Sequence, residues 1–394
     1  MQRATRELAA VLSQLDAAQL RRQRTTVEGF SAAGTRGVRV AGGRELIDFS
    51  SNDYLGLARH PALCAAMSEC SARLGAGSGA SHLVSGHGRE HALLEEELAV
   101  FTGRERALLF SCGYLANLAV MTVLAGRGER VLLDRLCHAS LIDGVRLSGA
   151  AFRRYAHADA HAAALAAKDP AHTCLIATDG VFSMDGDLAP LPQLARTARA
   201  HGAWLVVDDA HGLGVLGATG RGALETFGLD AEDVPVLVGT LGKAFGSFGA
   251  FVAGSAALIE LLIQKARSYI YTTALPQPVA AATRAALKVA QSEGWRRERL
   301  SELTARFRRT AAAAGVPLSP STTPIQPVVL GSAAAALAAQ RSLETAGLWV
   351  VAIRPPTVPP GAARLRVTLS AAHTDSEVDE LVRQLARVCA SAAT

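Results

Sequence analysis

The stretch CLIATDGVFSMDGDLAPLPQLARTARAHGAWLVVDDAHG, residues 174–212, decides the fold of this chain. Two short apolar runs, CLIA (174–177) and WLVV (204–207), flank LPQLARTARAHG (191–202), whose apolar residues recur at helical spacing. Strands without polar alternation are typical of parallel sheets that helices cover on both faces. The stretch therefore predicts one strand–helix–strand unit of an open α/β sheet.

The same alternation extends outward from this stretch, from about residue 90 to residue 268. After YTTALPQP (271–278) it gives way to an arginine-rich helix and a few short strands. We expect an α/β fold class, with a mostly parallel central sheet, helices on both faces and a smaller α+β domain. The expected parts are an N-terminal helix and hairpin that pack with the small domain (1–50), a large α/β domain (51–280) and the small C-terminal domain (281–394).

Composition excludes several classes of protein. The 394 residues include 40 Lys and Arg against 35 Asp and Glu, a net charge of +5, and 49% are hydrophobic, so a disordered chain is excluded. The basic residues are spread along the chain, which argues against nucleic-acid binding. Residues 108–126 carry no charge, but Gly113 and Asn117 interrupt them, so we expect a buried strand and helix and not a membrane span. Six cysteines without a CxxC pair and a charged first segment without a leader pattern predict a cytoplasmic location.

Candidate functional residues cluster after the predicted strands, where open α/β sheets bind their ligands. Each has a plain alternative explanation as a turn former, a helix cap or a solvated charge. Their joint occurrence in these loops favours a function. They are Gly113, His138, Ser183, Asp208, His211 and Lys243, the last within GTLGKAFGSFGA (239–250).

One type of cofactor chemistry would use all of these candidate residues together. A lysine held among glycines can form a Schiff base with an aldehyde cofactor, and a carboxylate such as Asp208 can keep a pyridine nitrogen protonated. The helix that Gly113 opens offers N–H groups to a phosphate. The residues therefore predict pyridoxal 5′-phosphate (PLP) as the cofactor and no metal.

The chain resembles the α-oxoamine synthases, a branch of the fold-type I PLP enzymes, over nearly its whole length. The resemblance rests on segments that occur in the family's order and spacing, among them FSSNDYLGLARHP (49–61), GSGASHLVSGH (77–87), LLFSCGYLAN (108–117), CHASLIDG (137–144), TDGVFSMDGDLAPL (178–191), VVDDAHGLGVLGATGRG (206–222) and GTLGKAFGSFGAF (239–251).

The resemblance implies roles for these residues. Lys243 would hold the cofactor, Asp208 would pair with its ring nitrogen, and His211 would bond its phenolic oxygen with Ser183 nearby. His138 would stack on the ring and help to position the acyl group. Gly113 and Tyr114 would bind the phosphate through backbone N–H groups, and Thr240 through its hydroxyl.

The resemblance also implies a reaction and partners. AIRPPTVPPGAARLRVTLSAAH (352–373) favours the branch that condenses L-alanine with a pimeloyl thioester, carried by coenzyme A or acyl carrier protein, during biotin biosynthesis. Sister enzymes that use glycine and form 2-amino-3-oxobutyrate or 5-aminolevulinate are the alternative. A homodimer is implied, with GSGASHLVSG (77–86) in its interface region.

Further residues are expected to bind substrate carboxylates or the acyl donor. Arg366 is the first choice for the amino-acid carboxylate because a guanidinium grips a carboxylate with two parallel hydrogen bonds. Arg354 competes for this role, and Thr357, Arg21 and Asn52 match substrate positions. Two departures stand out: Ala80-Ser81-His82 in the glycine loop leaves the loop's thioester contacts open, and Leu241 replaces a common aromatic. A non-catalytic relative would lack Lys243, and a nicotinamide-binding fold would need an early GxGxxG.

Overall fold

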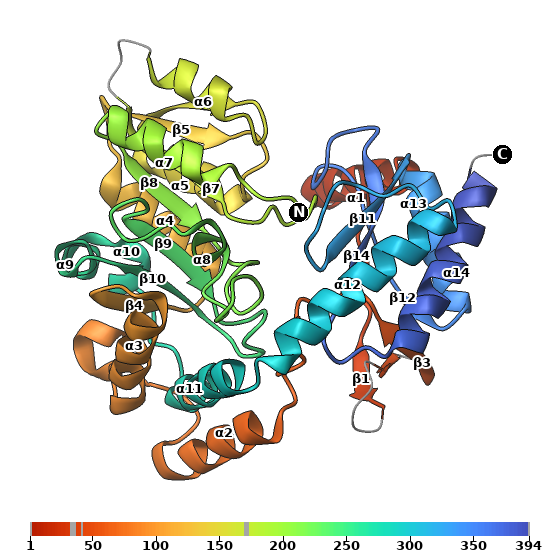
Figure 1. Cartoon of the computed structure of the whole chain (residues 1–394), viewed down its shortest axis with the longest axis horizontal. Helices are drawn as coiled ribbons and strands as arrows, with labels where there is room; N and C mark the ends of the chain where they lie inside the picture. Colours follow the sequence, from red (N-terminus) through yellow and green to blue (C-terminus); the bar gives the residue numbers. More distant parts are fainter. Residues whose placement is uncertain (1, 32–36, 41, 169–172, 393–394) are drawn as a thin grey trace. The chain divides into compact units, whose positions relative to one another are not determined.

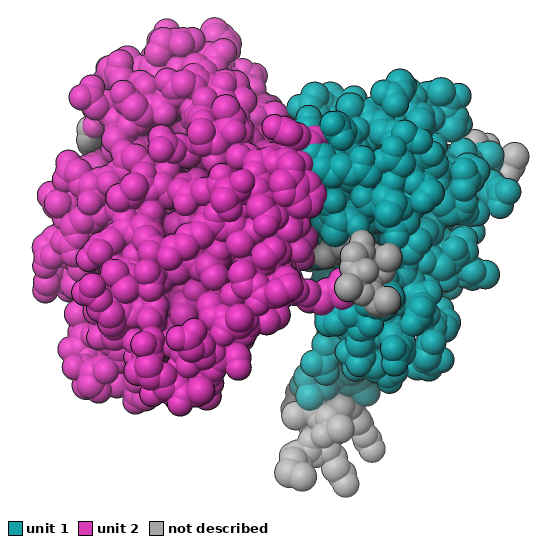
Figure 2. Space-filling model, turned by 60° about the horizontal axis from the view of Figure 1, so that its bottom comes forward, with its two compact units in different colours: residues 1–51, 184–186, 299–394 teal, residues 52–183, 187–298 magenta. Residues whose placement is uncertain are grey.

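The computed structural model of the chain describes residues 2–31, 37–40, 42–168 and 173–392. Its contacts divide the chain into two compact units, coloured separately in Figure 2. The large unit comprises residues 52–183 and 187–298, and the small unit comprises residues 1–51, 184–186 and 299–394.

A seven-stranded sheet forms the centre of the large unit, in the order β4-β10-β9-β8-β7-β5-β6 (Figure 1). The four pairs among β6, β5, β7, β8 and β9 are parallel, and β10 runs antiparallel to both of its neighbours. The strands are β4 (Arg106–Phe110), β5 (Arg130–Asp134), β6 (Ala151–Tyr155), β7 (Thr173–Asp179), β8 (Trp204–Asp208), β9 (Val236–Thr240) and β10 (Ala250–Gly254).

Both faces of this sheet are buried. Leu175 and Ala177 of β7 pack in a cluster with residues of α4, α5 and α9, whereas Ile176 between them packs with residues of α6 and α7. Side chains alternate across a strand, so a strand that is apolar at every position must be covered twice. The predicted α/β class with a mostly parallel sheet is confirmed.

The helices of the large unit follow the strands along the chain. They are α2 (Pro61–Leu74), the short π-helix η1 (His82–Gly86), α3 (Arg89–Thr102), α4 (Gly113–Leu124), α5 (Ala139–Ser148), α6 (Ala160–Ala167), α7 (Leu191–Ala200), α8 (Ala223–Phe227), α9 (Ala256–Lys265), α10 (Arg267–Ile270) and α11 (Gln277–Ser292). Residues 108–126 form most of β4 and all of α4, as expected. None of the described helices is both long and apolar enough to cross a membrane.

The small unit combines two sheets with helices. One sheet has the order β1-β2-β3-β12 and the other β11-β14-β13. Its elements are α1 (Gln2–Ala17), β1 (Val27–Phe30), β2 (Gly37–Val40), β3 (Arg44–Asp48), β11 (Ile325–Gly331), α13 (Ala333–Thr345), β12 (Leu348–Trp349), β13 (Val351–Ile353), β14 (Ala363–Thr368) and α14 (Asp375–Ala392). The N-terminal segment joins this unit because β3 pairs with β12 through Ile47 and Leu348.

The division between the units differs from the expected boundary at residue 280. That residue lies inside α11, and the division falls instead within α12 (Trp295–Ala313). The apolar face of α11 packs on α2 and α3, and Arg284 forms ion pairs with Glu90 and Glu97 of α3. The change of composition after residue 278 therefore does not mark a change of packing. Residues 184–186 also join the small unit, where Gly186 accepts hydrogen bonds from Ser321 and Thr323.

Candidate active site

A cavity of about 170 Å³ lies in the large unit where parallel strands end. Asp179 ends β7, Asp208 ends β8 and Thr240 ends β9, and all three residues line the cavity. Its lining brings together nearly all of the predicted cofactor residues, namely Gly113, Tyr114, His138, Asp208, His211, Thr240 and Lys243. Ser183 is not among the described residues that line the cavity, whereas Val181, two positions earlier, is one of them.

Asp208 is held in place by donors to both of its oxygens. The side-chain nitrogen of Asn117 donates to Oδ2 at 2.6 Å, and the backbone N–H of Ala210 donates to Oδ1 at 3.0 Å. Asn117 is fully buried on α4, and the same nitrogen lies 2.8 Å from the hydroxyl of Ser140. Sequence reasoning missed Asn117, although a single amide inside the apolar helix YLANLAVMTVL was a visible signal.

Asp179 is a second carboxylate that sequence reasoning missed. It pairs in register with Asp208 across β7 and β8, and it accepts a hydrogen bond from the backbone N–H of His138 at 2.9 Å. Burial, together with the charge of Asp208, raises the pKa of Asp179 well above its usual range. Ionisation of both carboxyl groups is unfavourable because their negative charges repel each other. A bound cation would reduce this repulsion, so this end of the cavity favours a cation. The rule that pointed to Asp208, a carboxylate at the end of a buried strand, applies equally to Asp179.

Lys243 lies in the tight loop between β9 and β10. Gly246 turns this loop with φ +62°, and a Cβ there would lie 2.3 Å from the backbone nitrogen of Ala58, so a side chain is excluded. The Lys243 Nζ is 2.9 Å from Nε2 of His211, whose Nδ1 is 2.6 Å from the hydroxyl of Tyr54. The Tyr54 hydroxyl in turn lies 3.4 Å from Oδ1 of Asn52.

The ring of His138 lies at the start of α5, which it caps. Its Nδ1 is 2.6 Å from the hydroxyl of Ser140 and accepts the backbone N–H of the same residue. Burial lowers the pKa of His138, and the charge of Lys243 acts in the same direction against that of Asp208. A neutral, apolar ring face in the cavity suits stacking against a flat aromatic ligand.

The N-terminus of α4 supplies donors for an anion. Gly113 is the first helical residue, and the first N–H groups of a helix have no partner within the helix. The hydroxyl of Tyr114 donates to Asp143 at 2.6 Å, which raises the pKa of Tyr114, and Tyr114 is among the residues that line the cavity. Thr240 donates its hydroxyl to the carbonyl oxygen of Gly249 at 3.1 Å, so it must turn to bond a phosphate.

The residues expected to bind substrate lie mostly in the small unit. Arg21 pairs with Asp16 at 2.7 Å, and both side chains are about half exposed. Arg354 bonds the backbone carbonyls of Gln19 and Arg21, and burial with the charge of Arg22 lowers its pKa.

Thr357 and Arg366 are held differently. Thr357 accepts from the guanidinium of Arg22 at 3.0 Å. Arg366 is buried on β14, where its Nη1 donates to the hydroxyl of Thr368 at 3.0 Å. The structure therefore groups Arg21, Arg354 and Thr357 around the segment 19–22 and holds Arg366 within a sheet. Their substrate roles stay predictions.

Comparisons with known proteins show the family of this chain. The family model for class I and II aminotransferases matches residues 44–385. The 8-amino-7-oxononanoate synthase of Thioalkalivibrio sulfidiphilus is 59% identical over 384 residues, which cover 97% of each chain. A solved structure of Francisella tularensis 8-amino-7-oxononanoate synthase is 32% identical with a TM-score of 0.78 and covers 89% of this chain and 99% of its own. Serine palmitoyltransferase from S. paucimobilis, solved with bound PLP and myriocin, is 29% identical with a TM-score of 0.92 and covers 98% of each chain.

Proposed function

The chain belongs to the class I and II aminotransferase family and, within it, to the 8-amino-7-oxononanoate synthases, and from this premise we propose that it condenses L-alanine with a pimeloyl thioester. The amino acid loses its carboxyl group as CO2, the thiol carrier leaves, and 8-amino-7-oxononanoate forms for biotin synthesis. The observation that carries the proposal is one cavity that holds an amine, a carboxylate pair and a helix N-terminus. Membership also confirms the predicted fold-type I enzyme and its PLP cofactor.

The donor set of the cavity fits PLP. Asp208 and Asp179 would face the cationic ring nitrogen, the N-terminus of α4 would take the phosphate with Thr240, and Lys243 would bond the aldehyde carbon. When bound, the cofactor supplies an electron-withdrawing ring that stabilises negative charge on the α-carbon of the amino acid. The neutral ring of His138 would cover one face of the cofactor, as the resemblance implies. Ser183 is not among the residues that line the cavity, and its place near the phenolic oxygen stays a prediction.

The neighbours of Lys243 prepare its amine to move protons. One arrangement of protons satisfies the whole row: Nζ donates to Nε2 of His211, Nδ1–H donates to the oxygen of Tyr54, and the Tyr54 hydroxyl donates to Asn52. The hydrogen bond to Nε2 of His211 fixes the position of Nζ, which lets the amine accept the α-proton of alanine. We assign the role of general base to Lys243 and a positioning role to His211 and Tyr54.

The carboxylates of the substrates need cations, and the proposed cations are Arg366, Arg21 and Arg354. Arg366 is buried and fixed by β14, which suits a single small carboxylate such as that of alanine. Arg21 and Arg354 are more exposed, which suits a longer, mobile ligand such as the pimeloyl chain with its terminal carboxylate and carrier. Thr357 and Asn52 are proposed to contact the same substrates.

We propose a homodimer as the working form. The stretch predicted to lie in the interface, residues 77–86, exposes Leu83 and Val84, at 50% and 79%. Two neighbouring exposed apolar side chains on a short π-helix support a protein contact there. The predicted cytoplasmic location stays a prediction.

Product analysis tests the proposed reaction. Purified PLP-loaded enzyme is incubated with alanine or glycine and with pimeloyl or acetyl thioesters, each pimeloyl chain being supplied on coenzyme A and on acyl carrier protein. We expect 8-amino-7-oxononanoate from alanine with a pimeloyl donor, measured by mass spectrometry, and we expect Lys243→Ala to lose at least about 10³-fold in turnover because the amine is the base. Faster turnover with glycine and acetyl-coenzyme A would place the enzyme among the glycine-using synthases instead.

A further inference from the structure

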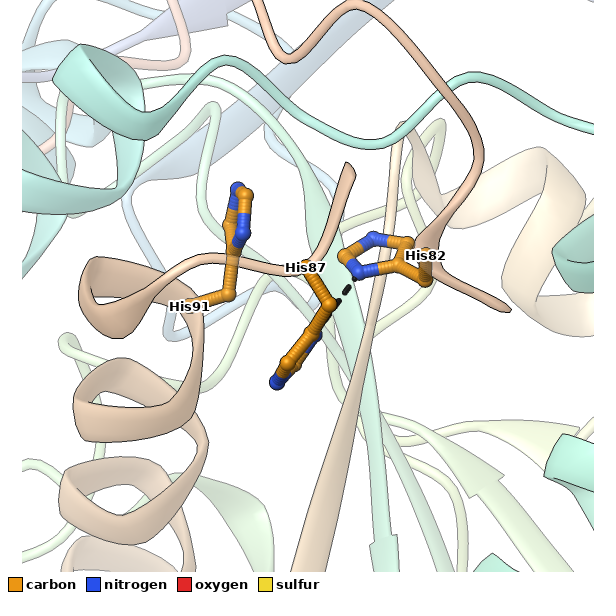
Figure 3. Close-up of side chains that lie close together, drawn as sticks. All are labelled: His82, His87 and His91. Atoms are coloured by element: carbon orange, nitrogen blue, oxygen red, sulfur yellow. Dashed lines mark hydrogen bonds between the residues drawn. The ribbon is translucent and has the colours of Figure 1, made fainter. Parts of the chain in front are cut away.

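Three histidines of the large unit lie close together, and none of them is among the residues that line the cavity. His82 opens η1, His87 follows its end, and His91 lies in the first turn of α3. Figure 3 shows the three side chains close together, with a dashed line for the hydrogen bond between His82 and His87. One nitrogen of each ring lies within 4.8 Å of the others, and the Nδ1 atoms of His82 and His87 are 2.9 Å apart.

The backbone and neighbouring side chains fix this arrangement. A Cβ on Gly86 would lie 2.1 Å from the carbonyl oxygen of Ala80, so the tight turn that returns the chain from His82 to His87 requires glycine. The ring of His82 stacks on Tyr269 with centroids 5.0 Å apart and planes at 11°. The three histidines therefore lie on one continuous segment, residues 82–91, and α10 packs against it through Tyr269.

His91 is oriented as metal-binding histidines are. Its Nε2 bonds the carbonyl oxygen of Leu275, which leaves the lone pair on Nδ1. A histidine ligand commonly donates its second N–H to a backbone carbonyl, which fixes the tautomer. Nδ1 now accepts the backbone N–H of Gly88 at 3.0 Å, a bond worth about 1 kcal/mol that a metal would replace.

We propose that His82, His87 and His91 bind one divalent transition-metal ion, with Zn²⁺ as the preferred occupant. Zn²⁺ binds imidazole nitrogens at about 2.0–2.1 Å, so tetrahedral ligand atoms lie roughly 3.3 Å apart. The observed separations, from 2.9 Å to at most 4.8 Å, bracket that value, and small ring rotations reach it. His91 is buried, His82 half-buried and His87 exposed, which gives the ion a path from solvent. The fourth position is left for water.

The site would cross-link η1 to α3. The exposed Leu83 and Val84 belong to η1, so an ion on its first residue would stiffen the segment proposed above to contact a second copy. This consequence rests on the proposed homodimer, whereas metal binding itself does not. The proposed ion would lie apart from the donor set of the cavity, because the three histidines are not among the residues that line it.

Zinc binding by the tag-free, PLP-loaded protein tests the proposal. Equilibrium dialysis against buffered Zn²⁺ at pH 7.5, with metal counted by mass spectrometry, should give one ion per chain. X-ray absorption should give a first shell with three imidazole nitrogens at about 2.0 Å. His87→Gln and His82→Gln should each weaken binding at least about 10-fold, since each removes one of three ligands.

A matched control separates this site from surface binding. His161→Gln removes an exposed histidine at the start of α6 and should leave one ion per chain. The thermal unfolding midpoint and the absorbance of bound PLP show whether each variant folds. Binding of less than one ion by the unchanged protein, or unchanged affinity in a folded His87→Gln variant, would overturn the proposal whatever the substrate tests show.

Discussion

Two regions at the same edge of the large sheet contain the same residue types and arrange them differently. Beyond β5 and β6, His157 lies between two carboxylates, with Nδ1 3.0 Å from Asp134 and Nε2 2.8 Å from Asp187. Beyond β7 and β8, Asp179 and Asp208 lie side by side, and the nearby His138 bonds a serine hydroxyl through its Nδ1.

The electrostatic outcomes are opposite. Burial disfavours a charged His157, but its two carboxylate partners outweigh burial and raise its pKa to about 10. Burial prevails at His138, whose pKa falls. The first region therefore holds its own cation between its two carboxylates and acts as structure. The second keeps negative charge that a cationic ring nitrogen can neutralise, and this is how a binding site differs from an ion cluster of the same composition.

Among the variants that test the difference between the two regions, Asp208→Asn has the largest expected effect on catalysis. An amide cannot hold a ring nitrogen in its protonated form, so stabilisation of the α-carbanion is lost. We expect turnover and exchange of the alanine α-proton to fall by about 10²–10³-fold. Deuterium exchange into alanine, followed by NMR on the PLP-loaded protein, measures this step without the acyl donor.

Asp134→Asn is the matched control, because Asp134 also ends a parallel strand. It should exchange the α-proton within a few fold of the unchanged enzyme. Equal losses in the two variants would show that the regions do not differ in function.

His157→Gln should weaken the fold and spare the chemistry. Removing one partner of a largely buried ion cluster should cost on the order of 2–4 kcal/mol of unfolding free energy. Because the pKa of His157 is raised in the folded state, its stabilisation is complete below about pH 6.5, falls as the pH rises, and is gone above about pH 10. Urea unfolding at pH 6, 8 and 10 measures it. A variant as stable as the unchanged protein at pH 6 would contradict this assignment.

Asn117→Ala should have the smallest effect of the three. It removes the donor 2.6 Å from Asp208 Oδ2 but leaves the carboxylate in the cavity. We expect about a tenfold loss in kcat with a smaller change in KM, since a mispositioned carboxylate still pairs with the ring nitrogen. Asn117→Gln, which keeps an amide, should recover part of the loss. No change of kcat in the alanine variant would mean that Ala210 alone holds Asp208.

Local pattern predicted the large unit well because its strands bury both faces. A run such as WLVV is apolar at every position, so its composition alone predicts a strand that is buried on both faces. The uncharged residues 108–126 likewise predicted a buried strand and helix. The boundary at residue 280 failed for the opposite reason. The small, largely alanine face of α11 gives no sign in sequence of which unit it packs against.

Within the site, the residues at or just after the ends of strands could be predicted from the sequence. Their hydrogen-bond partners could not. Asp208, Lys243 and His138 follow buried strands, and the cavity unites them. Tyr54 and Asn117 reach His211 and Asp208 from 157 and 91 positions away, and no spacing rule spans such separations.

The sequence alone determined the sheet, the reactive amine and the carboxylate that suits a pyridine ring, since each depends on a local pattern or a residue type. Only the tertiary structure decided which histidine is charged and which is neutral. Charge state depends on the carboxylates, hydroxyls and burial that folding assembles around a ring, and His157 and His138 look alike until those neighbours are in place.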